Sequence, residues 1–308
     1  MSRVIDLDIE KFNFDRSVIG LGNFDGFHIG HREVIKKVIE ISKKENIKSS
    51  VLVFKQHTNE VFPHFPRYYI SSLQDKIDTL TKLGIDYIFI INFTIEFAQL
   101  SNEEFILDFI KDSLNADILV CGPDYTFGKL SKGTVKELYQ YQAENKIKVY
   151  IQDYVKDGNR KVSSTTIRNL IQNGQVNLIK DLLGDNYTIT GEVIHGYKIG
   201  SRELGYPTAN IKLNFRYIMP GEGVYLTYVY YNDNKYLSLT SIGTNPTVTD
   251  NLDIKLEVYI IDFNKEIYGE TLKIEFIEKI RNQVKFDTKE ELIKQMDSDY
   301  QFAINYFK

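Results

Sequence analysis

The apolar positions of this chain recur with one period before Gly184 and with another after it. In the first part, apolar residues three or four apart predict amphipathic helices at Gly30–Asn46 and Ser72–Leu83. Ser101 and Glu104 form a capping box that predicts the start of another helix. Strands that alternate with helices predict a parallel sheet covered on both faces. The remaining predicted elements are strands at Ser17–Gly22, Ser49–Phe54, Asp86–Ile91, Asp117–Cys121 and Lys148–Ile151, and short helices at Ser164–Gln172 and Gln175–Leu183.

After residue 186 the pattern changes to short β-like segments whose spacing is typical of a small antiparallel barrel. A final amphipathic helix follows Asp287. We therefore predict two domains: an α/β domain with a parallel sheet at residues 1–185, and an antiparallel β-barrel with a terminal helix at residues 186–308. The predicted barrel segments are Thr188–His195, Gly223–Tyr231, Lys235–Ile242, Lys255–Ile261 and Thr271–Lys279.

Composition narrows the set of partners. The 308 residues are 43% hydrophobic and 26% charged with a net charge of −4, which argues against a nucleic-acid-binding surface. The chain shows no signal-peptide core, and no apolar run reaches the roughly 20 residues that span a bilayer, so we expect no membrane partner. The single cysteine, Cys121, fits a reducing compartment, and we expect the protein in the cytoplasm. We interpret Cys121 as a small buried residue at a strand end and not as a nucleophile.

The first segment with candidate chemistry is Gly22–His31, between the first predicted strand and the first predicted helix. Parallel sheets bind ligands at the carboxyl ends of their strands. Glycines let the backbone approach a phosphate, and the start of a helix offers free N–H groups. His28 and His31 can donate hydrogen bonds to phosphate oxygens that gain charge as pyrophosphate leaves. The segment therefore predicts a nucleotide-transfer site.

The second segment is Val162–Arg168, in which three hydroxyl residues precede a predicted helix. They predict an N-cap and a phosphate cradle, and Arg168 in the first turn is a candidate bidentate phosphate donor. A plain capped helix with a surface arginine would show the same pattern. Together with Gly22–His31, the segment is typical of the nucleotidyltransferase superfamily that has an HxGH motif.

Three other interpretations of the histidine motif rank lower. A zinc site would recruit His57 or His64, but no Cys/His cluster has zinc spacing. A dinucleotide fingerprint starting at Gly20 is broken by Asp25 in the third-glycine position. Class I aminoacyl-tRNA synthetases share the HxGH string, and Lys129–Lys132 mimics their second ATP-binding signature, but the chain has no evident anticodon-binding domain.

The second half carries a long glycine-punctuated loop, His195–Asn210, that ends in a rigid turn at Pro207-Thr208-Ala209-Asn210. Backbone amides in such a loop can wrap a polyphosphate, although a glycine-rich barrel turn has the same composition. The Thr208 hydroxyl and the Asn210 carbonyl are hard oxygen ligands of the kind that suits Mg²⁺. No Walker-type phosphate loop occurs anywhere in the chain.

Glu257 interrupts an apolar strand. A carboxylate there either faces solvent or acts as a positioned base. By alternation it shares a face with Lys255 and Tyr259, which slightly favours the solvent-facing alternative.

With these motifs in place, the chain resembles the bacterial bifunctional FAD synthetases over nearly its whole length. The first half resembles their FMN adenylyltransferase domain, a Rossmann-like nucleotidyltransferase, and the second half their riboflavin kinase domain. Pro207–Asn210 is the most specific string, and Ser241–Thr247 and Glu257–Gly269 follow in the expected order. Arg281 and Phe286–Asp299 look like the flavin-side loop and the terminal helix of the family.

The resemblance implies an activity, with riboflavin, FMN and ATP as substrates and Mg²⁺ as the cofactor. The barrel would phosphorylate riboflavin to FMN, with Glu257 as the base and Thr208 and Asn210 as metal ligands. The α/β domain would adenylylate FMN to FAD, with His28 and His31 among its catalytic residues. Further implied residues are, for catalysis, Arg168; for ATP and phosphate, Gly22, Asn23, Phe24, Gly30, Ser163, Ser164, Thr165, Gly196, Gly200, Gly205 and Pro207; and for flavin, His57, Asp124, Phe127, Arg281 and Phe286.

The chain departs from the family after the second strand. Where many relatives have Phe-Asp-Pro-His-Pro, this sequence has Phe54-Lys55-Gln56-His57-Thr58. The acid and both prolines are absent, so the flavin position is less constrained than the ATP position. The departure motivates an alternative, a riboflavin kinase whose first domain only binds flavin or nucleotide. The intact histidine pair and Arg168 favour the bifunctional interpretation.

Overall fold

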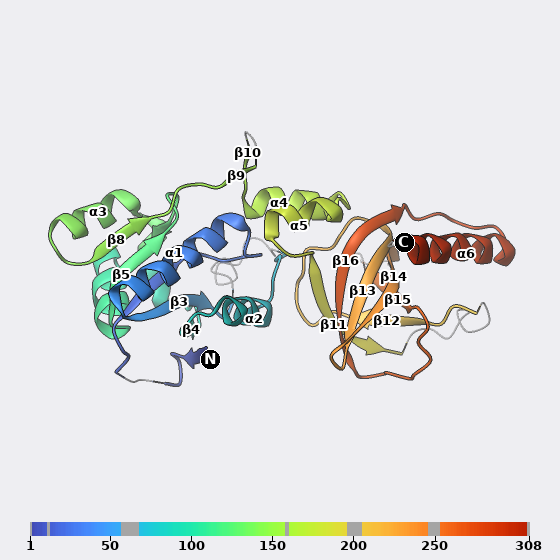
Figure 1. Ribbon diagram of the computed structural model, residues 1–308, viewed down its shortest axis with the longest axis horizontal. Helices are drawn as coiled ribbons and strands as arrows, with labels where there is room; N and C mark the ends of the chain where they lie inside the picture. Colours follow the sequence, from blue (N-terminus) through green and yellow to red (C-terminus); the bar gives the residue numbers. More distant parts are fainter. Residues whose placement is uncertain are drawn as a thin grey trace. The chain divides into compact units, whose positions relative to one another are not determined.

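The computed structural model describes residues 2–10, 13–56, 68–157, 160–195, 205–245 and 253–306. The chain divides into two compact units, Met1–Ser164 and Thr165–Lys308 (Figure 1). By this division the predicted short helices after residue 164 belong with the barrel. This division rests on contacts within each unit and not on activity. The predicted boundary between the two catalytic domains, after residue 185, therefore stays a prediction.

In the described part of the first unit, parallel strands form a six-stranded sheet in the order β1-β4-β3-β2-β5-β8. Its central strands are rich in Val and Ile and are buried on both faces, as expected for a parallel sheet. The strands are β1 (Arg3–Asp6), β2 (Ser17–Leu21), β3 (Lys48–Phe54), β4 (Tyr87–Ile91), β5 (Ala116–Cys121) and β8 (Lys148–Ile151). All but β1 were predicted.

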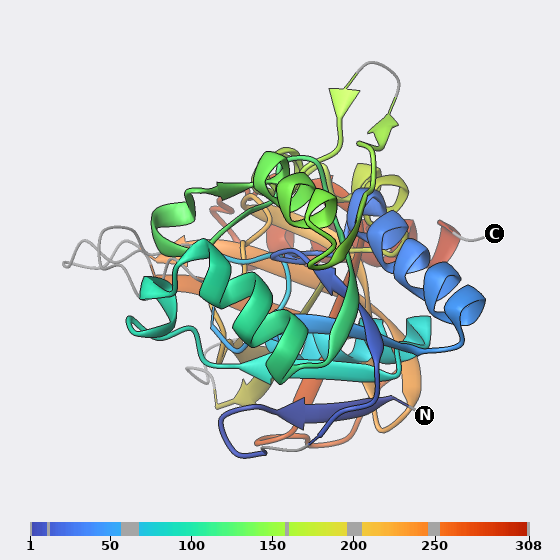
Figure 2. The ribbon, with the colours of Figure 1, turned by 90° about the vertical axis from the view of Figure 1, so that its left-hand side faces the viewer.

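Helices cover both faces of this sheet. On one face, α1 (Ile29–Glu45) and α2 (Leu73–Leu83) contribute Val34, Ile35 and Leu80 to one apolar core. On the other face, the segment η3 (Glu104–Ser113) and α3 (Val135–Ala143) contribute Phe105, Ile110 and Leu138 to a second core. Figure 2 shows α1 and η3 on opposite sides of the strands. The predicted two-sided covering is confirmed.

The start of η3 follows the predicted capping box. The Ser101 hydroxyl accepts from the Glu104 N–H at 3.2 Å, and the Glu104 carboxylate accepts from the Ser101 N–H at 2.7 Å. The segment then winds as a π-helix and ends with a bond from the Leu114 N–H to the Phe109 carbonyl. Shorter elements of the first unit are η2 (Phe97–Gln99), β6 (Thr126–Phe127), η4 (Lys129–Ser131), β7 (Gly133–Thr134), β9 (Lys156–Asp157) and β10 (Arg160–Lys161).

The second unit contains a closed antiparallel barrel in the order β11-β12-β15-β14-β13-β16 (Figure 1). The described strands are β11 (Thr188–Ile194), β12 (Thr208–Lys212), β13 (Gly223–Tyr231), β14 (Asn234–Asn245), β15 (Asp253–Ile260) and β16 (Thr271–Arg281). We did not predict β12, which we had interpreted as the end of the glycine loop. The helical elements of this unit are α4 (Ser164–Gln172), η5 (Val176–Leu178), α5 (Ile179–Leu183) and α6 (Lys289–Asn305).

The terminal helix α6 covers part of the outer face of the barrel. Its Ala303 is fully buried and packs with Leu226 of β13 and Leu239 of β14. The barrel interior holds a buried hydroxyl cluster, in which Thr227 contacts Ser238 at 2.7 Å and Thr240 at 2.8 Å. These buried hydroxyls satisfy one another's hydrogen bonds inside the barrel.

Candidate active sites

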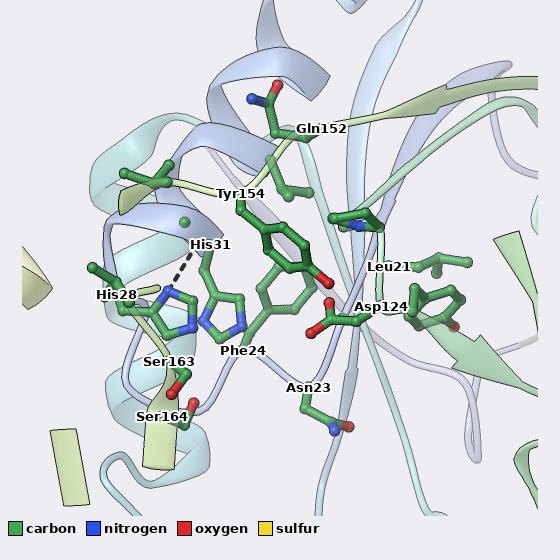
Figure 3. Close-up of a pocket in the computed structure, with 18 of the residues that line it drawn as sticks. Leu21, Asn23, Phe24, His28, His31, Asp124, Gln152, Tyr154, Ser163 and Ser164 are labelled. Carbon is green, nitrogen blue, oxygen red and sulfur yellow. Dashed lines mark hydrogen bonds between the residues drawn. The ribbon is translucent and has the colours of Figure 1, made fainter. Parts of the chain in front are cut away.

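A pocket of about 280 Å³ lies at the carboxyl ends of β2, β5 and β8 in the first unit (Figure 3). This is the edge at which a parallel sheet binds ligands. Nine of the predicted site residues line it: Gly22, Asn23, Phe24, His28, Gly30, His31, Asp124, Ser163 and Ser164. The two segments with the predicted phosphate chemistry, far apart in the sequence, therefore meet at one cavity.

The loop between β2 and α1 has a conformation that few sequences tolerate. Phe24 and Phe27 both have positive φ angles, 46° and 45°, although neither is glycine. Their rings are almost fully buried and stack with centroids 5.5 Å apart. Gly26 has a φ of 85°, and a Cβ added there would lie 2.7 Å from Ile70. Buried rings thus hold a strained backbone in place, as is common where a loop is shaped for a ligand.

His28 is the N-cap of α1. Its Nδ1 accepts a hydrogen bond from the His31 N–H at 3.3 Å. Because Nδ1 is the acceptor, a neutral His28 carries its proton on Nε2 and can donate from that atom. The two imidazoles stack with centroids 3.7 Å apart and planes 17° apart. Both rings line the pocket, as Figure 3 shows.

Burial keeps His31 neutral. Loss of hydration lowers the pKa of His31 well below 6.5, and the charges of His28 and Lys76 lower it further. Within the described part of the chain, Nδ1 of His31 is buried without a hydrogen-bond partner. The edge of its ring contacts Phe24 at a centroid distance of 5.3 Å. His31 therefore reaches the pocket as a neutral imidazole, a hydrogen-bond donor without a full charge.

Two buried charged residues that we did not predict support the loop from beneath. Asp25, 2% exposed, accepts hydrogen bonds from the N–H groups of Ile70 at 3.0 Å and Ser71 at 3.2 Å. Lys76 of α2, 8% exposed, donates from Nζ to the Asn23 carbonyl at 3.2 Å. The sequence contains a sign that Lys76 is buried, because it lies four residues before Leu80 on the apolar face of its helix.

The hydroxyl of Ser164 is already committed. It donates to the Asp25 carbonyl at 3.0 Å and so ties the second segment to the loop. A hydroxyl has a single proton to donate. While this bond is present, Ser164 can offer a phosphate its backbone N–H but not its O–H.

The far wall of the pocket comes from residues that follow β8, which we also did not predict. Gln152, Asp153 and Tyr154 line the cavity, and Figure 3 shows the Tyr154 hydroxyl pointing toward Asp124. The same rule that located Gly22–His31 would have found them, because they directly follow a predicted strand of the sheet.

Three predicted residues lie elsewhere. Phe127 is 4% exposed, and its ring packs with Phe105 and Tyr125 in the core, with centroids about 6 Å away, so it is not among the pocket-lining residues. Thr165 and Arg168 belong to the second unit. Their contacts with a nucleotide in the first unit stay predictions.

The outer face of the barrel carries the second candidate site. Glu257 of β15 lies directly opposite Asn210 of β12 and Ser241 of β14 in the strand register. Its neighbours Leu256 and Val258 are buried inside, so Glu257 faces outward, and the predicted alternation is confirmed. Thr208, two residues from Asn210 along β12, is on the same outer face.

Polar residues lie beside Glu257 on the outer face of the barrel. Its side chain is 25% exposed and pairs with Lys255 at 2.9 Å. Gln283, which we did not predict, donates to the Ser241 hydroxyl at 2.8 Å and the Ile242 carbonyl at 3.0 Å. The side chains of Thr208, Asn210 and Glu257 place three oxygen-bearing groups on one face, and oxygen ligands of this kind suit Mg²⁺. Within the described residues no cluster of three or more His, Cys, Asp or Glu side chains could hold a metal, but the predicted ligands here are a hydroxyl and an amide.

The predicted flavin-side residues of the barrel are engaged with the terminal helix. Arg281 donates from Nε and Nη2 to the Asp299 carboxylate of α6 at 2.8–3.0 Å. Its guanidinium lies 6.0 Å from the Phe286 ring centroid. Gly205 and Pro207 directly precede β12, and Gly205 has a φ of 81°. His57, Gly196 and Gly200 lie outside the described residues.

Comparison with known families agrees with this division of sites. Residues 11–166 match the FAD synthetase family, and residues 183–307 match the riboflavin kinase family. The chain is 37% identical to the bifunctional riboflavin kinase/FMN adenylyltransferase of Listeria monocytogenes, over 94% of this chain and 92% of that protein. It is 38% identical to the protein of the same description from Bacillus subtilis, over 95% and 93% of the two chains. The chain belongs to the bifunctional riboflavin kinase/FMN adenylyltransferase family.

Membership in this family makes the chain an enzyme of flavin biosynthesis. The FAD synthetase match contains the pocket of the first unit, and the riboflavin kinase match contains the site on the barrel. The alternative interpretation of the histidine motif, as that of a class I aminoacyl-tRNA synthetase, finds no support in these matches. A crystal structure described as a macrolide-efflux protein from Streptococcus pneumoniae has the same fold, with a TM-score of 0.89 and 33% identity over 98% of this chain and 99% of that one. Among the described residues, no helix has the length and apolar character needed to cross a bilayer.

Proposed function

We propose that this member of the family phosphorylates riboflavin with ATP on the outer face of the barrel, and then adenylylates FMN to FAD at the pocket of the first unit. The observation that carries the proposal is the pair of stacked imidazoles, His28 and His31, at the carboxyl edge of a parallel sheet. Adenylyl transfer needs donors placed around a phosphate and no covalent intermediate.

In the adenylylation, a phosphate oxygen of FMN attacks the α-phosphorus of ATP and pyrophosphate leaves. His28 donates from Nε2, because its Nδ1 caps α1. His31 adds a neutral N–H donor from the same side of the pocket. The N–H groups at the start of α1 complete the set, because they have no partners within the helix. One such donor contributes about 10²–10³ in rate. Ser163, Ser164, Thr165 and Arg168 are the proposed binders of the leaving pyrophosphate.

In the phosphorylation, the oxygen of the ribityl 5′-hydroxyl attacks the γ-phosphorus of ATP, the Glu257 carboxylate accepts the hydroxyl proton, and ADP leaves. A substrate hydroxyl can reach Glu257, because its side chain faces outward and is 25% exposed. Thr208 and Asn210 are the residues that would hold Mg²⁺. Bound there, the ion would neutralise charge on the ATP phosphates. Arg281 and Phe286 are the proposed boundary of the flavin site.

The departure after β3 has a structural explanation. Lys55 forms ion pairs with Asp6 at 2.7 Å and Asp8 at 2.9 Å. It thereby anchors the segment that follows β1 to the end of β3. Because Lys55 has this local role, its presence does not by itself favour the alternative of a kinase with an inactive first domain.

The test uses the full chain with riboflavin, ATP and Mg²⁺, and separates products by chromatography. We expect FMN to appear first and FAD to follow. Glu257→Gln should abolish FMN formation from riboflavin yet still convert added FMN to FAD, whereas His31→Ala should do the reverse. Glu270→Gln, at an exposed position of the barrel, is the matched control. FMN that accumulates without FAD would support the kinase-only alternative, and absence of both products would refute the proposal.

A further inference from the structure

One buried cation beneath the histidine loop has no part in the chemistry described so far. Lys76 comes from α2, 45 residues after the loop segment that ends at His31, and its side chain is 8% exposed. Lysine is almost never buried to this degree unless a partner compensates its charge. The surroundings of Lys76 therefore indicate what it does there.

The contacts of Lys76 lie on the loop backbone and on Asp25. Its Nζ donates to the Asn23 carbonyl at 3.2 Å. Burial lowers the pKa of Lys76, and the Asp25 carboxylate opposes this shift by raising it, so the two charges lie near each other. Asp25 in turn accepts from the N–H groups of Ile70 and Ser71, in the segment that leads into the same helix. Lys76 and Asp25 thus connect α2 to the strained loop.

This connection runs directly behind the catalytic pair. Asn23, whose carbonyl accepts from Lys76, and Phe24, whose ring contacts His31, both line the pocket. The charge of Lys76 lowers the pKa of His31, because the Lys76 side chain and the Nδ1 atom of His31 are both buried and water screens their interaction poorly. The other charged or titratable groups that face this region are His28 and Asp25 on the loop and, across the pocket, Asp124, Tyr125, Asp153 and Tyr154.

We propose that Lys76 is a positioning residue for adenylyl transfer, which holds the Asn23–Gly26 backbone in its strained form and keeps a fixed positive charge behind the His28–His31 pair. The inference rests on the proposed adenylylation of FMN. The fixed charge has a specific consequence: it opposes protonation of His31, so that the imidazole meets the substrate as a neutral donor. A lysine that only filled space would hold the loop but would not change how His31 titrates.

The test compares three variants of the full chain. Lys76→Met keeps the length of the side chain and removes its charge. Asp25→Asn combined with Lys76→Met removes both the lysine charge and the carboxylate charge that acts on it. Lys82→Met, at an exposed position on the same helix, is the matched control. The rate of FAD formation from FMN and ATP is measured together with the rate of FMN formation from riboflavin, which serves as an internal measure of folded enzyme.

We expect Lys76→Met to lower kcat for FAD formation about 10²-fold, as a small misplacement of catalytic groups does. Its riboflavin kinase rate should stay within about twofold of wild type, because the barrel is a separate unit. Lys82→Met should leave both rates unchanged. Wild-type kcat for FAD formation in Lys76→Met would overturn the proposal. If no protein, including wild type, makes FAD, the proposed function fails instead.

A second readout separates charge from shape. The chain has five histidines, so the ring signals of His31 can be assigned in a ¹H–¹³C NMR spectrum and followed with pH. We expect His31 to resist protonation in wild type and in Lys82→Met, and to titrate at a higher pH in Lys76→Met, where the charge that opposes its protonation is gone. The double variant should titrate between the two. An unchanged His31 titration in a folded Lys76→Met protein would overturn the role of the charge. If Lys76→Met does not fold, the double variant decides both readouts.

Discussion

The imidazole rings of His28 and His31 stack face to face, and the Nδ1 atom of the first accepts the backbone N–H of the second. His28 therefore has two functions, one at the end of α1 and one toward the pocket. Replacement by asparagine separates them, because asparagine is among the best N-cap residues but has no imidazole.

We expect His28→Asn to keep the stability of the first unit within about 0.5 kcal/mol, and His28→Ala to cost about 1 kcal/mol through loss of the cap. Both variants should lower FAD formation about 10²–10³-fold, because both lose the Nε2 donor. Urea unfolding and the FMN-to-FAD assay are the measurements. Normal FAD formation in His28→Asn would show that only the cap matters.

The neutral state of His31 predicts a pH dependence of stability. The pKa of His31 is lowered well below 6.5 in the folded protein, so below pH 6.5 the unfolded chain binds a proton there that the folded chain does not. Stability from this group is therefore present above pH 6.5 and is lost as the pH falls. The slope contributed by one such proton is at most about 1.4 kcal/mol per pH unit.

We expect wild type to lose more stability than His31→Asn between pH 7.5 and pH 5.5. The difference between the two proteins isolates His31 from the other histidines. Urea midpoints followed by circular dichroism at several pH values provide the measurement. Parallel pH curves for the two proteins would contradict a buried neutral His31.

Cys121 offers a simple check on the core behind the pocket. It is fully buried at the end of β5, and burial together with the Asp124 charge raises the pKa of its thiol to about 12. A thiol without thiolate character or access reacts slowly. We expect no labelling by iodoacetamide at pH 8 in the native protein and one labelled thiol in guanidinium. Rapid native labelling with loss of FAD formation would contradict this, and would place Cys121 at the surface of the pocket.

The strands of the sheet could be predicted because each is a Val- and Ile-rich run bounded by polar residues. Two strands escaped prediction. β1 is only Arg3–Asp6, with charged residues at both ends, and it exists because it pairs with β4, more than 80 residues later. β12 directly follows Pro207 and was hidden in a loop signature. Both depend on pairing partners that a local pattern does not contain.

The candidate sites divide in the same way. His28 and His31 became candidates because a local motif marks them, whereas Glu257 received its proposed role only from the family resemblance. Lys76 and Gln283 could not be assigned a role, because their contacts with Asn23 and Ser241 span 53 and 42 residues of sequence. Phe127, which the resemblance implied as a flavin-binding residue, packs its ring against Phe105, so its contact with flavin stays a prediction.

The ion pair between Arg281 and Asp299 gives the last prediction. Asp299 is 5% exposed and accepts three hydrogen bonds from Arg281 and one from Gln295 at 2.9 Å. The pair joins β16 to α6. Removal of the charge on Asp299 alone leaves a mostly buried guanidinium without its partner, and this costs more than the pair itself contributes.

We expect Asp299→Asn to destabilise the barrel by about 3 kcal/mol, and Arg281→Met with Asp299→Leu to recover most of that loss, because apolar residues of similar volume replace a buried pair well. Glu290→Gln, at an exposed position of α6, is the matched control. The stabilities of wild type and the three variants are compared by urea unfolding. If the double variant is as unstable as Asp299→Asn, the contacts of α6 depend on the pair itself, and the helix is held by charge more than by Ala303 and its apolar neighbours.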